Sequence, residues 1–76
     1  RHHTIIDIYC AERPGLLHAL AQLFFNLGLT VDLARISTEG HRAADAFYVR
    51  TPDGKRVQGA LEERVVAEIL AALSQL

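Results

Sequence analysis

The sequence is poor in cysteine, in net charge and in long apolar runs, and each shortage excludes a class of protein. A single thiol cannot form an internal disulfide, which excludes the disulfide frameworks of small secreted domains. We therefore expect Cys10 to be a small buried apolar residue in a reducing compartment, the cytoplasm. No apolar stretch approaches the roughly 20 residues that a membrane-spanning helix requires, and no signal peptide opens the chain, so no membrane contact is expected.

Charge is nearly balanced along the chain. Eight basic and nine acidic side chains give a net charge of −1, which provides no electrostatic footprint for nucleic acid. Half of the 76 residues are hydrophobic and 22% are charged, so we expect residues 1–76 to form one globular domain. A chain of this size buries only about 60% of its surface on folding, and a partner would add burial. Because the first residue is Arg1 rather than Met, we interpret the sequence as a fragment of a larger protein.

The residue patterns of catalytic and metal sites do not occur. Ser37 and Ser74 lack the glycines of a nucleophile elbow, Cys10 falls inside a predicted strand, and no glycine-rich phosphate-binding motif is found. His2 and His3 are adjacent and would point to opposite faces of a strand, so they are not spaced as metal ligands. We therefore expect no catalytic residue and no metal site in this chain.

Hydrophobic periodicity divides the chain into five elements. Alternating apolar residues predict strands, and apolar residues three and four positions apart predict helices. The expected elements are strands over His3–Cys10, Thr30–Thr38 and Ala43–Arg50, and helices from Pro14 to Gly28 and from Ala60 to the end.

Turns and helix ends are marked by proline and glycine. Pro14 suits the first position of a helix, and Gly28 suits a left-handed cap at the end of one. We expect tight turns at 39–41 and 51–54, and a bulge where the apolar phase shifts within 30–38. The stripes expected to face the core are Leu16, Leu17, Leu20, Phe24 and Leu27 in the first helix, and Leu61, Val65, Ile69, Leu70 and Leu73 in the second.

The order β-α-β-β-α predicts an α+β fold of the ferredoxin-like type, with an antiparallel sheet and two helices on one face. Such a fold would normally place a fourth strand beside the first, and that strand is missing here. The edge of the first strand is therefore expected to be unpaired, and unpaired edges favour association. Apolar residues on both faces of the first strand also favour contact with another module.

The segment Glu12–Leu17 is the candidate binding site. It joins the first strand to the first helix, so the free backbone N–H groups of that helix could bind an anion such as an amino-acid carboxylate. Gly15 would let a ligand approach the backbone closely. Asp32, from this chain or a neighbour, could accept the ammonium group. The alternative is that Pro14 and Gly15 only begin a helix and that Asp32 is a solvated strand residue.

Two stretches resemble a known family. Glu12-Arg13-Pro14-Gly15-Leu16-Leu17, followed by Leu27-Gly28-Leu29-Thr30-Val31, is similar to the signature of the ACT domain, although Glu12 stands where aspartate is usual. The run from Ala34 to Val49 resembles one ACT subgroup, the C-terminal ACT domains of bifunctional PII-protein uridylyltransferase/uridylyl-removing enzymes. The similarity extends over nearly the whole chain, from Thr4 to Leu76.

This resemblance implies a regulatory domain that binds an amino acid, glutamine in this subgroup, and controls the catalytic domains of a larger enzyme. It also implies pairing with another ACT domain, as a homodimer or in tandem. No cofactor is implied for these residues, and Mg²⁺ is expected only in the parent enzyme. The ligand-binding residues carried over are Arg13, Pro14, Gly15, Leu16, Leu17, Val31 and Asp32. A docking module without ligand binding is the alternative.

Overall fold

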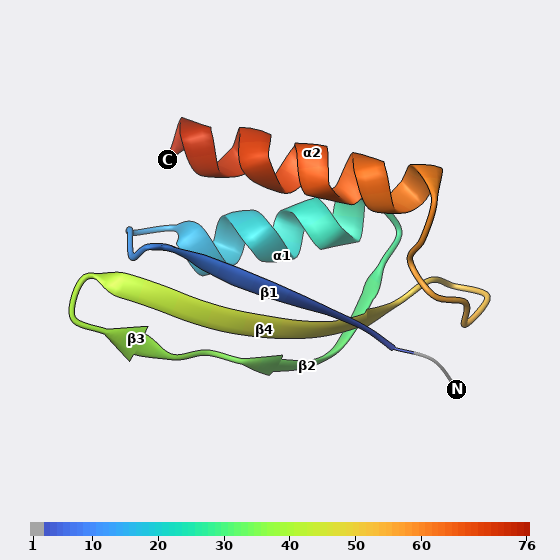
Figure 1. Ribbon diagram of the computed structural model, residues 1–76, viewed down its shortest axis with the longest axis horizontal. Helices are drawn as coiled ribbons and strands as arrows, with labels where there is room; N and C mark the ends of the chain where they lie inside the picture. Colours follow the sequence, from blue (N-terminus) through green and yellow to red (C-terminus); the bar gives the residue numbers. More distant parts are fainter. Residues whose placement is uncertain (1–2) are drawn as a thin grey trace.

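The computed structural model describes residues 3–76 and contains an antiparallel sheet and two helices (Figure 1). Arg1 and His2 lie outside the described residues, and so does the prediction made for His2. The elements in chain order are β1 (Thr4–Ala11), α1 (Leu16–Asn26), β2 (Thr30–Arg35), β3 (Thr38–Glu39), β4 (Arg42–Arg50) and α2 (Ala60–Gln75).

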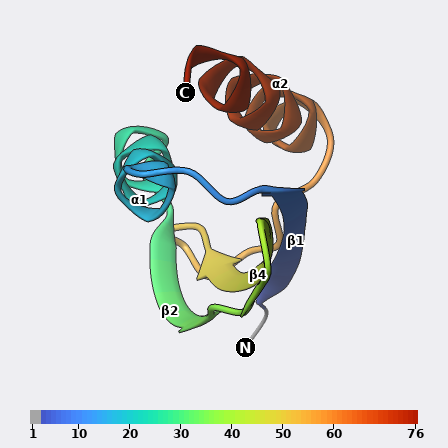
Figure 2. The ribbon, with the colours of Figure 1, turned by 90° about the vertical axis from the view of Figure 1, so that its left-hand side faces the viewer.

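β4 is the central strand. It pairs antiparallel with β1 along one edge and with β2 and β3 along the other, which gives the order β1-β4-β2. Both helices lie on the same face of this sheet, with α1 over β2 and α2 on the side of β1 (Figure 2). This arrangement confirms the predicted ferredoxin-like α+β fold. Within residues 3–76, no strand pairs with the outer edge of β1 or of β2.

The core lies between the sheet and the helices. Alternate residues of β4 are buried against the helices, and Phe47 is the largest of them. Its ring packs on Phe24 of α1 with ring centroids 5.2 Å apart. Leu20 and Phe24 of α1 are fully buried, as is Val49 of β4. The predicted face of α1 is therefore confirmed at these positions. Neither helix of the described chain is long and apolar enough to cross a membrane.

Gly28 ends α1 as the sequence predicts. It adopts a left-handed conformation with φ of 76°. The N–H of Leu29 then donates to the carbonyl of Phe24 at 2.9 Å, and the N–H of Gly28 donates to Phe25 at 3.0 Å. This pattern satisfies carbonyl groups that the end of a helix leaves unpaired.

Both predicted helix faces need a correction. α1 begins at Leu16, not at Pro14, because Gly15 adopts a left-handed backbone that is incompatible with the helix. Leu17 is 47% exposed and does not belong to the core stripe. In α2, Val65 and Ile69 are buried as predicted, whereas Leu70 is exposed because it lies about 100° around the helix from Ile69.

The predicted strand over Thr30–Thr38 is interrupted at 36–37, which is a second correction. The backbone N–H of Ser37 donates to Oδ1 of Asp45 at 3.3 Å, while the Ser37 carbonyl accepts from the N–H of Ala44 at 2.8 Å. These bonds turn the chain away from the regular ladder. It rejoins β4 as the two-residue β3, so the turn contains only Gly40 and His41.

Replacing Leu20 by alanine should lower the free energy of unfolding by about 2–5 kcal/mol, because it leaves a cavity in a fully buried site. The matched change Leu17→Ala should cost less than about 1 kcal/mol, because Leu17 is largely exposed. Urea unfolding of both variants measures the difference. Equal losses would contradict the assigned core face of α1.

Candidate ligand-binding site

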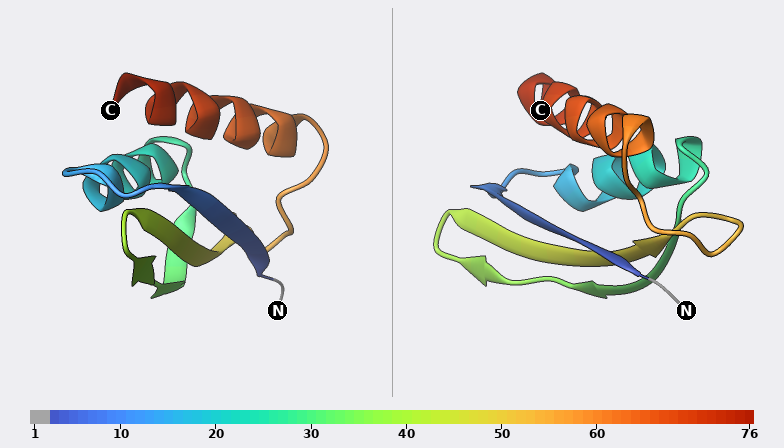
Figure 3. Two further views of the ribbon diagram at one scale, coloured as in Figure 1. Left: turned by 60° about the vertical axis from the view of Figure 1, so that its left-hand side comes forward. Right: turned by 45° about the vertical axis from the view of Figure 1, so that its right-hand side comes forward.

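The loop of residues 12–15 connects the end of β1 to the start of α1. It lies at the end of the sheet where β4 begins (Figure 3). The N–H of Glu12 donates to the carbonyl of His41 at 2.7 Å, which ties the loop to the turn between β3 and β4. The loop is thus held by the sheet on one side and by α1 on the other.

The start of α1 has no side-chain cap. Gly15 occupies the capping position, and no acidic side chain lies in the first turn. The N–H of Leu16 donates to the carbonyl of Arg13, whereas the N–H groups of Leu17 and His18 have no acceptor within residues 3–76. Free N–H groups and the positive end of the helix dipole both favour an anion. A carboxylate is therefore a suitable ligand for this end of α1.

Gly15 leaves the backbone open to a ligand. Its φ of 83° lies in the left-handed region that glycine adopts most readily. An added Cβ would find no atom within 4 Å, so the space beside this residue is open. A ligand can approach the helix N-terminus from this side without displacing protein atoms.

The other predicted loop residues differ in what they can offer. Arg13 and Pro14 are exposed, and Nη1 of Arg13 donates to the carbonyl of Leu76 at the end of α2. Leu16 is buried in the core, so only its backbone could contact a ligand. The half-exposed side chain of Leu17 could line the site.

Val31 and Asp32 lie at the opposite end of the sheet. Val31 is opposite Val49, near the end of β4, whereas the loop adjoins Arg42, where β4 begins. The length of β4 corresponds to about 26 Å, so the loop and Asp32 do not converge within one chain. A ligand that contacts both must lie between two chains or two domains.

Asp32 joins the three main strands on the face turned away from the helices. Its Oδ2 accepts from Nε of Arg50 in β4 at 2.6 Å and contacts Nε2 of His3, just before β1, at 2.8 Å. Asp32 itself sits at the predicted bulge of β2, where the register shifts between Val31 and Leu33. The hydrogen bond from Arg50, and then that from His3, hold the pKa of Asp32 below its ordinary value. The other oxygen, Oδ1, has no partner among the described residues.

Asp45 is a polar residue that the sequence analysis did not single out. It is 3% exposed, on the helix-facing side of β4. Its hydrogen bond from Ser37 fixes the break between β2 and β3. The alternation of β4 could have predicted the burial, because Asp45 shares a face with Phe47 and Val49.

The described part of the chain also contains a groove, beside β1. This groove of about 600 Å³ follows the free edge of β1 beneath α2, lined in part by Ile6, Val65 and Ile69, and it does not include the loop. No three histidine, cysteine or acidic side chains among residues 3–76 are grouped as metal ligands. The open loop remains the candidate site.

Comparison with known proteins agrees with the resemblance noted in the sequence. The family model of the ACT domain matches residues 4–68. A bifunctional uridylyltransferase/uridylyl-removing enzyme of Caulobacter vibrioides is 41% identical over 73 residues, which are 95% of this chain and 8% of that protein. The enzyme of the same name from Azospirillum brasilense is 44% identical over 55 residues, 72% of this chain and 6% of that protein. The chain thus spans a small part of these relatives.

A solved structure shows the same fold. An unknown protein from Galdieria sulphuraria superposes with a TM-score of 0.72 at 20% identity, over 91% of this chain and 37% of that one. At this identity, the likeness concerns the fold alone.

The pH dependence of the unfolding free energy tests the contribution of the Asp32 contacts to stability. Because the pKa of Asp32 is lower in the folded chain than its ordinary value of 3.8, its contribution to stability is present above about pH 4 and is lost as the pH falls toward the folded pKa. Asp32→Asn should therefore flatten part of the acid branch of a plot of unfolding free energy against pH. Glu63→Gln is the control, since Glu63 is an exposed residue of α2 that has no ion pair among the described residues. Identical acid branches for the two variants would contradict this role.

Proposed function

The chain belongs to the ACT domain family, and we propose that it is a non-catalytic regulatory domain that senses an amino acid, with glutamine as the favoured ligand. In this proposal residues 1–76 are one domain of a larger cytoplasmic enzyme. The names of the relatives favour a uridylyltransferase/uridylyl-removing enzyme as that parent. Glutamine would report nitrogen sufficiency and favour removal of uridylyl groups from the PII protein over their addition.

The uncapped start of α1 is the observation that most directly supports this proposal. The α-carboxylate of an amino acid would accept from the N–H groups of Leu17 and His18. Gly15 would allow the ligand to approach the backbone, and Arg13 and Pro14 would flank it. No cofactor is proposed for this domain.

A second ACT domain would supply the rest of the site. If two β2 edges pair antiparallel, the start of one β2 lies at the loop end of the other domain. Val31 and Asp32 of the partner would then approach the loop, and Oδ1 of Asp32 would remain available to an ammonium group. The free edge of β2 supports such pairing, either in a homodimer or with a tandem ACT domain.

Regulation would follow from a shift in population. A ligand between two domains stabilises the arrangement that it binds more tightly, and the catalytic domains respond to that arrangement. Coupling of this kind is typically worth about 1–3 kcal/mol.

The second candidate is a docking module without a ligand. The unpaired edges of β1 and β2 favour it, because they would support association whether or not an amino acid binds. Ligand response separates the two candidates.

A thermal-unfolding scan of the chain with each of the twenty amino acids at millimolar concentration tests the sensor. A ligand that binds only the folded state, at 100 times its dissociation constant, adds about 2.7 kcal/mol of stability. We expect a selective increase with glutamine. If no amino acid stabilises either this chain or a tandem of two ACT domains from the parent, the chain is a docking module.

Gly15→Val should abolish this response, because its side chain would occupy the approach to α1. The matched control is Gly54→Val, which has similar backbone strain, since φ is 78° at Gly54 and 83° at Gly15. Gly54 lies in the turn after β4, at the other end of the sheet. Both variants should lose some stability, but only Gly15→Val should lose stabilisation by the ligand. Retained response in Gly15→Val would contradict the assigned site.

A further inference from the structure

The sheet face turned away from the helices carries exposed apolar side chains. We call it the outer face, and no helix or strand of residues 3–76 covers it (Figure 2). Tyr9 and Ile5 of β1 are 70% and 53% exposed, and Leu33 of β2 is 48% exposed. The central residues of this face are Ile5, Asp7, Tyr9, Ala44, Ala46, Tyr48, Leu33 and Arg35, and Arg42 and Arg50 share it at the two ends of β4.

The register arranges this face in rows across the three strands. Directly opposed residues of antiparallel strands share a face. Ile5 and Leu33 are both opposite Tyr48, which makes one apolar row. Asp7 and Arg35 are both opposite Ala46, which makes the next row acidic at one end and basic at the other.

Asp7 and Arg35 do not neutralise each other within the chain. They lie two strand spacings apart, about 10 Å, with the small side chain of Ala46 between them. Neither forms an ion pair with another residue of the described part of the chain. The face thus presents an apolar row beside two opposite charges without partners.

We propose that a second copy of this chain docks face to face on the outer face. The two copies are related by a two-fold axis that lies between the two sheets and runs parallel to β4. A rotation about that axis places β1 of one copy opposite β2 of the other. Asp7 then faces Arg35 of the second copy, and the reverse contact forms on the other side. Ile5 faces Leu33 in the same way, and Tyr48 meets Tyr48 on the axis.

Asp7 and Arg35 favour this orientation over the other two-fold arrangement, whereas Arg42 and Arg50 do not discriminate, since arginines face each other at the ends of β4 in both. An axis across the strands along the Ala46 row would set Asp7 against Asp7 and Arg35 against Arg35, which is unfavourable. The central positions Ala44 and Ala46 have small side chains, which lets the two sheets approach to the usual separation of about 10 Å. At the end of the face, Asp32 is already paired with Arg50 and contributes a polar rim.

This pairing rests on the association of ACT domains proposed above, but it does not require a bound amino acid. It leaves the loop at 12–15 and the outer edge of β2 open, so the ACT partner that completes the amino-acid site can still bind there. The two surfaces are therefore separable by experiment.

Sedimentation of the purified chain tests the proposal. The wild-type chain should form dimers at micromolar concentration. Asp7→Arg and Arg35→Asp should each weaken dimerisation by about tenfold or more, because like charges would face each other. The double variant, with the two charges exchanged, should recover the wild-type affinity.

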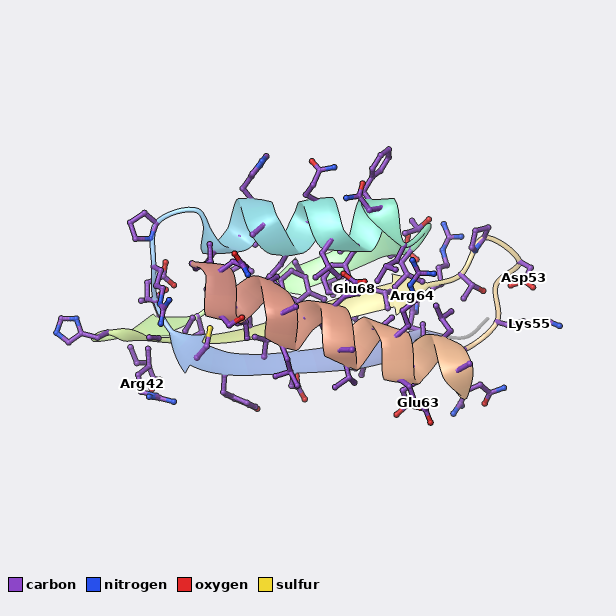
Figure 4. The ribbon with its side chains drawn as sticks, turned by 90° about the horizontal axis from the view of Figure 1, so that it is seen from above. Arg42, Asp53, Lys55, Glu63, Arg64 and Glu68 are labelled. Carbon is purple, nitrogen blue, oxygen red and sulfur yellow. The ribbon has the colours of Figure 1, made fainter. Side chains whose placement is uncertain are left out.

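The controls reproduce the same charge changes on α2. Glu63→Arg and Arg64→Asp alter exposed residues on the far side of the molecule from the outer face, as Figure 4 shows, and should leave dimerisation unchanged. A wild-type chain that stays monomeric at millimolar concentration overturns the proposal. So does a charge exchange that fails to restore the dimer, or single reversals without effect. If the chain forms the dimer but no amino acid stabilises it, that result counts against the sensor function and leaves the dimer proposal standing.

Discussion

The burial of alternate β4 residues beneath the helices is the constraint on which the rest of the structure depends. Phe47 and Val49 are fixed in the core by α1, and this sets which face of β4 points outward. Because β4 pairs along both edges, the same constraint sets the register of β1 and β2. The loop at 12–15 is thereby placed at one end of the sheet and Asp32 at the other.

The four-stranded sheet and its two helices leave surfaces that a partner can use. The outer edges of β1 and β2 pair with no strand of residues 3–76, and the outer face exposes Ile5 and Tyr9. A chain of this size gains stability from further burial. In the proposed function, association and ligand binding are linked, because the loop would bind the carboxylate while a second domain would supply the rest of the amino-acid site.

The sequence was informative where local chemistry decides the structure. The apolar alternation of 43–50 predicted β4, and Gly28 predicted the end of α1, because glycine readily adopts the backbone that a helix cap needs. The ACT signature predicted the fold, which the family match confirms. The bulge of the second strand was also expected, although its position at Asp32 was not. The role of the loop in ligand binding stays a prediction.

Contacts between distant residues could not be predicted. The break at Ser37 depends on Asp45, a buried side chain from another strand, and the position of Asp32 depends on Arg50 and His3. Leu17 fits an apolar stripe but is exposed, because it lies about 100° around the helix from the buried Leu16.

The most direct test of the account is an amide NMR titration with glutamine, carried out on the chain alone and on the chain paired with a second ACT domain. We predict the largest shifts at the amides of Gly15, Leu17 and His18, and shifts confined to other regions, or none in either sample, would contradict it.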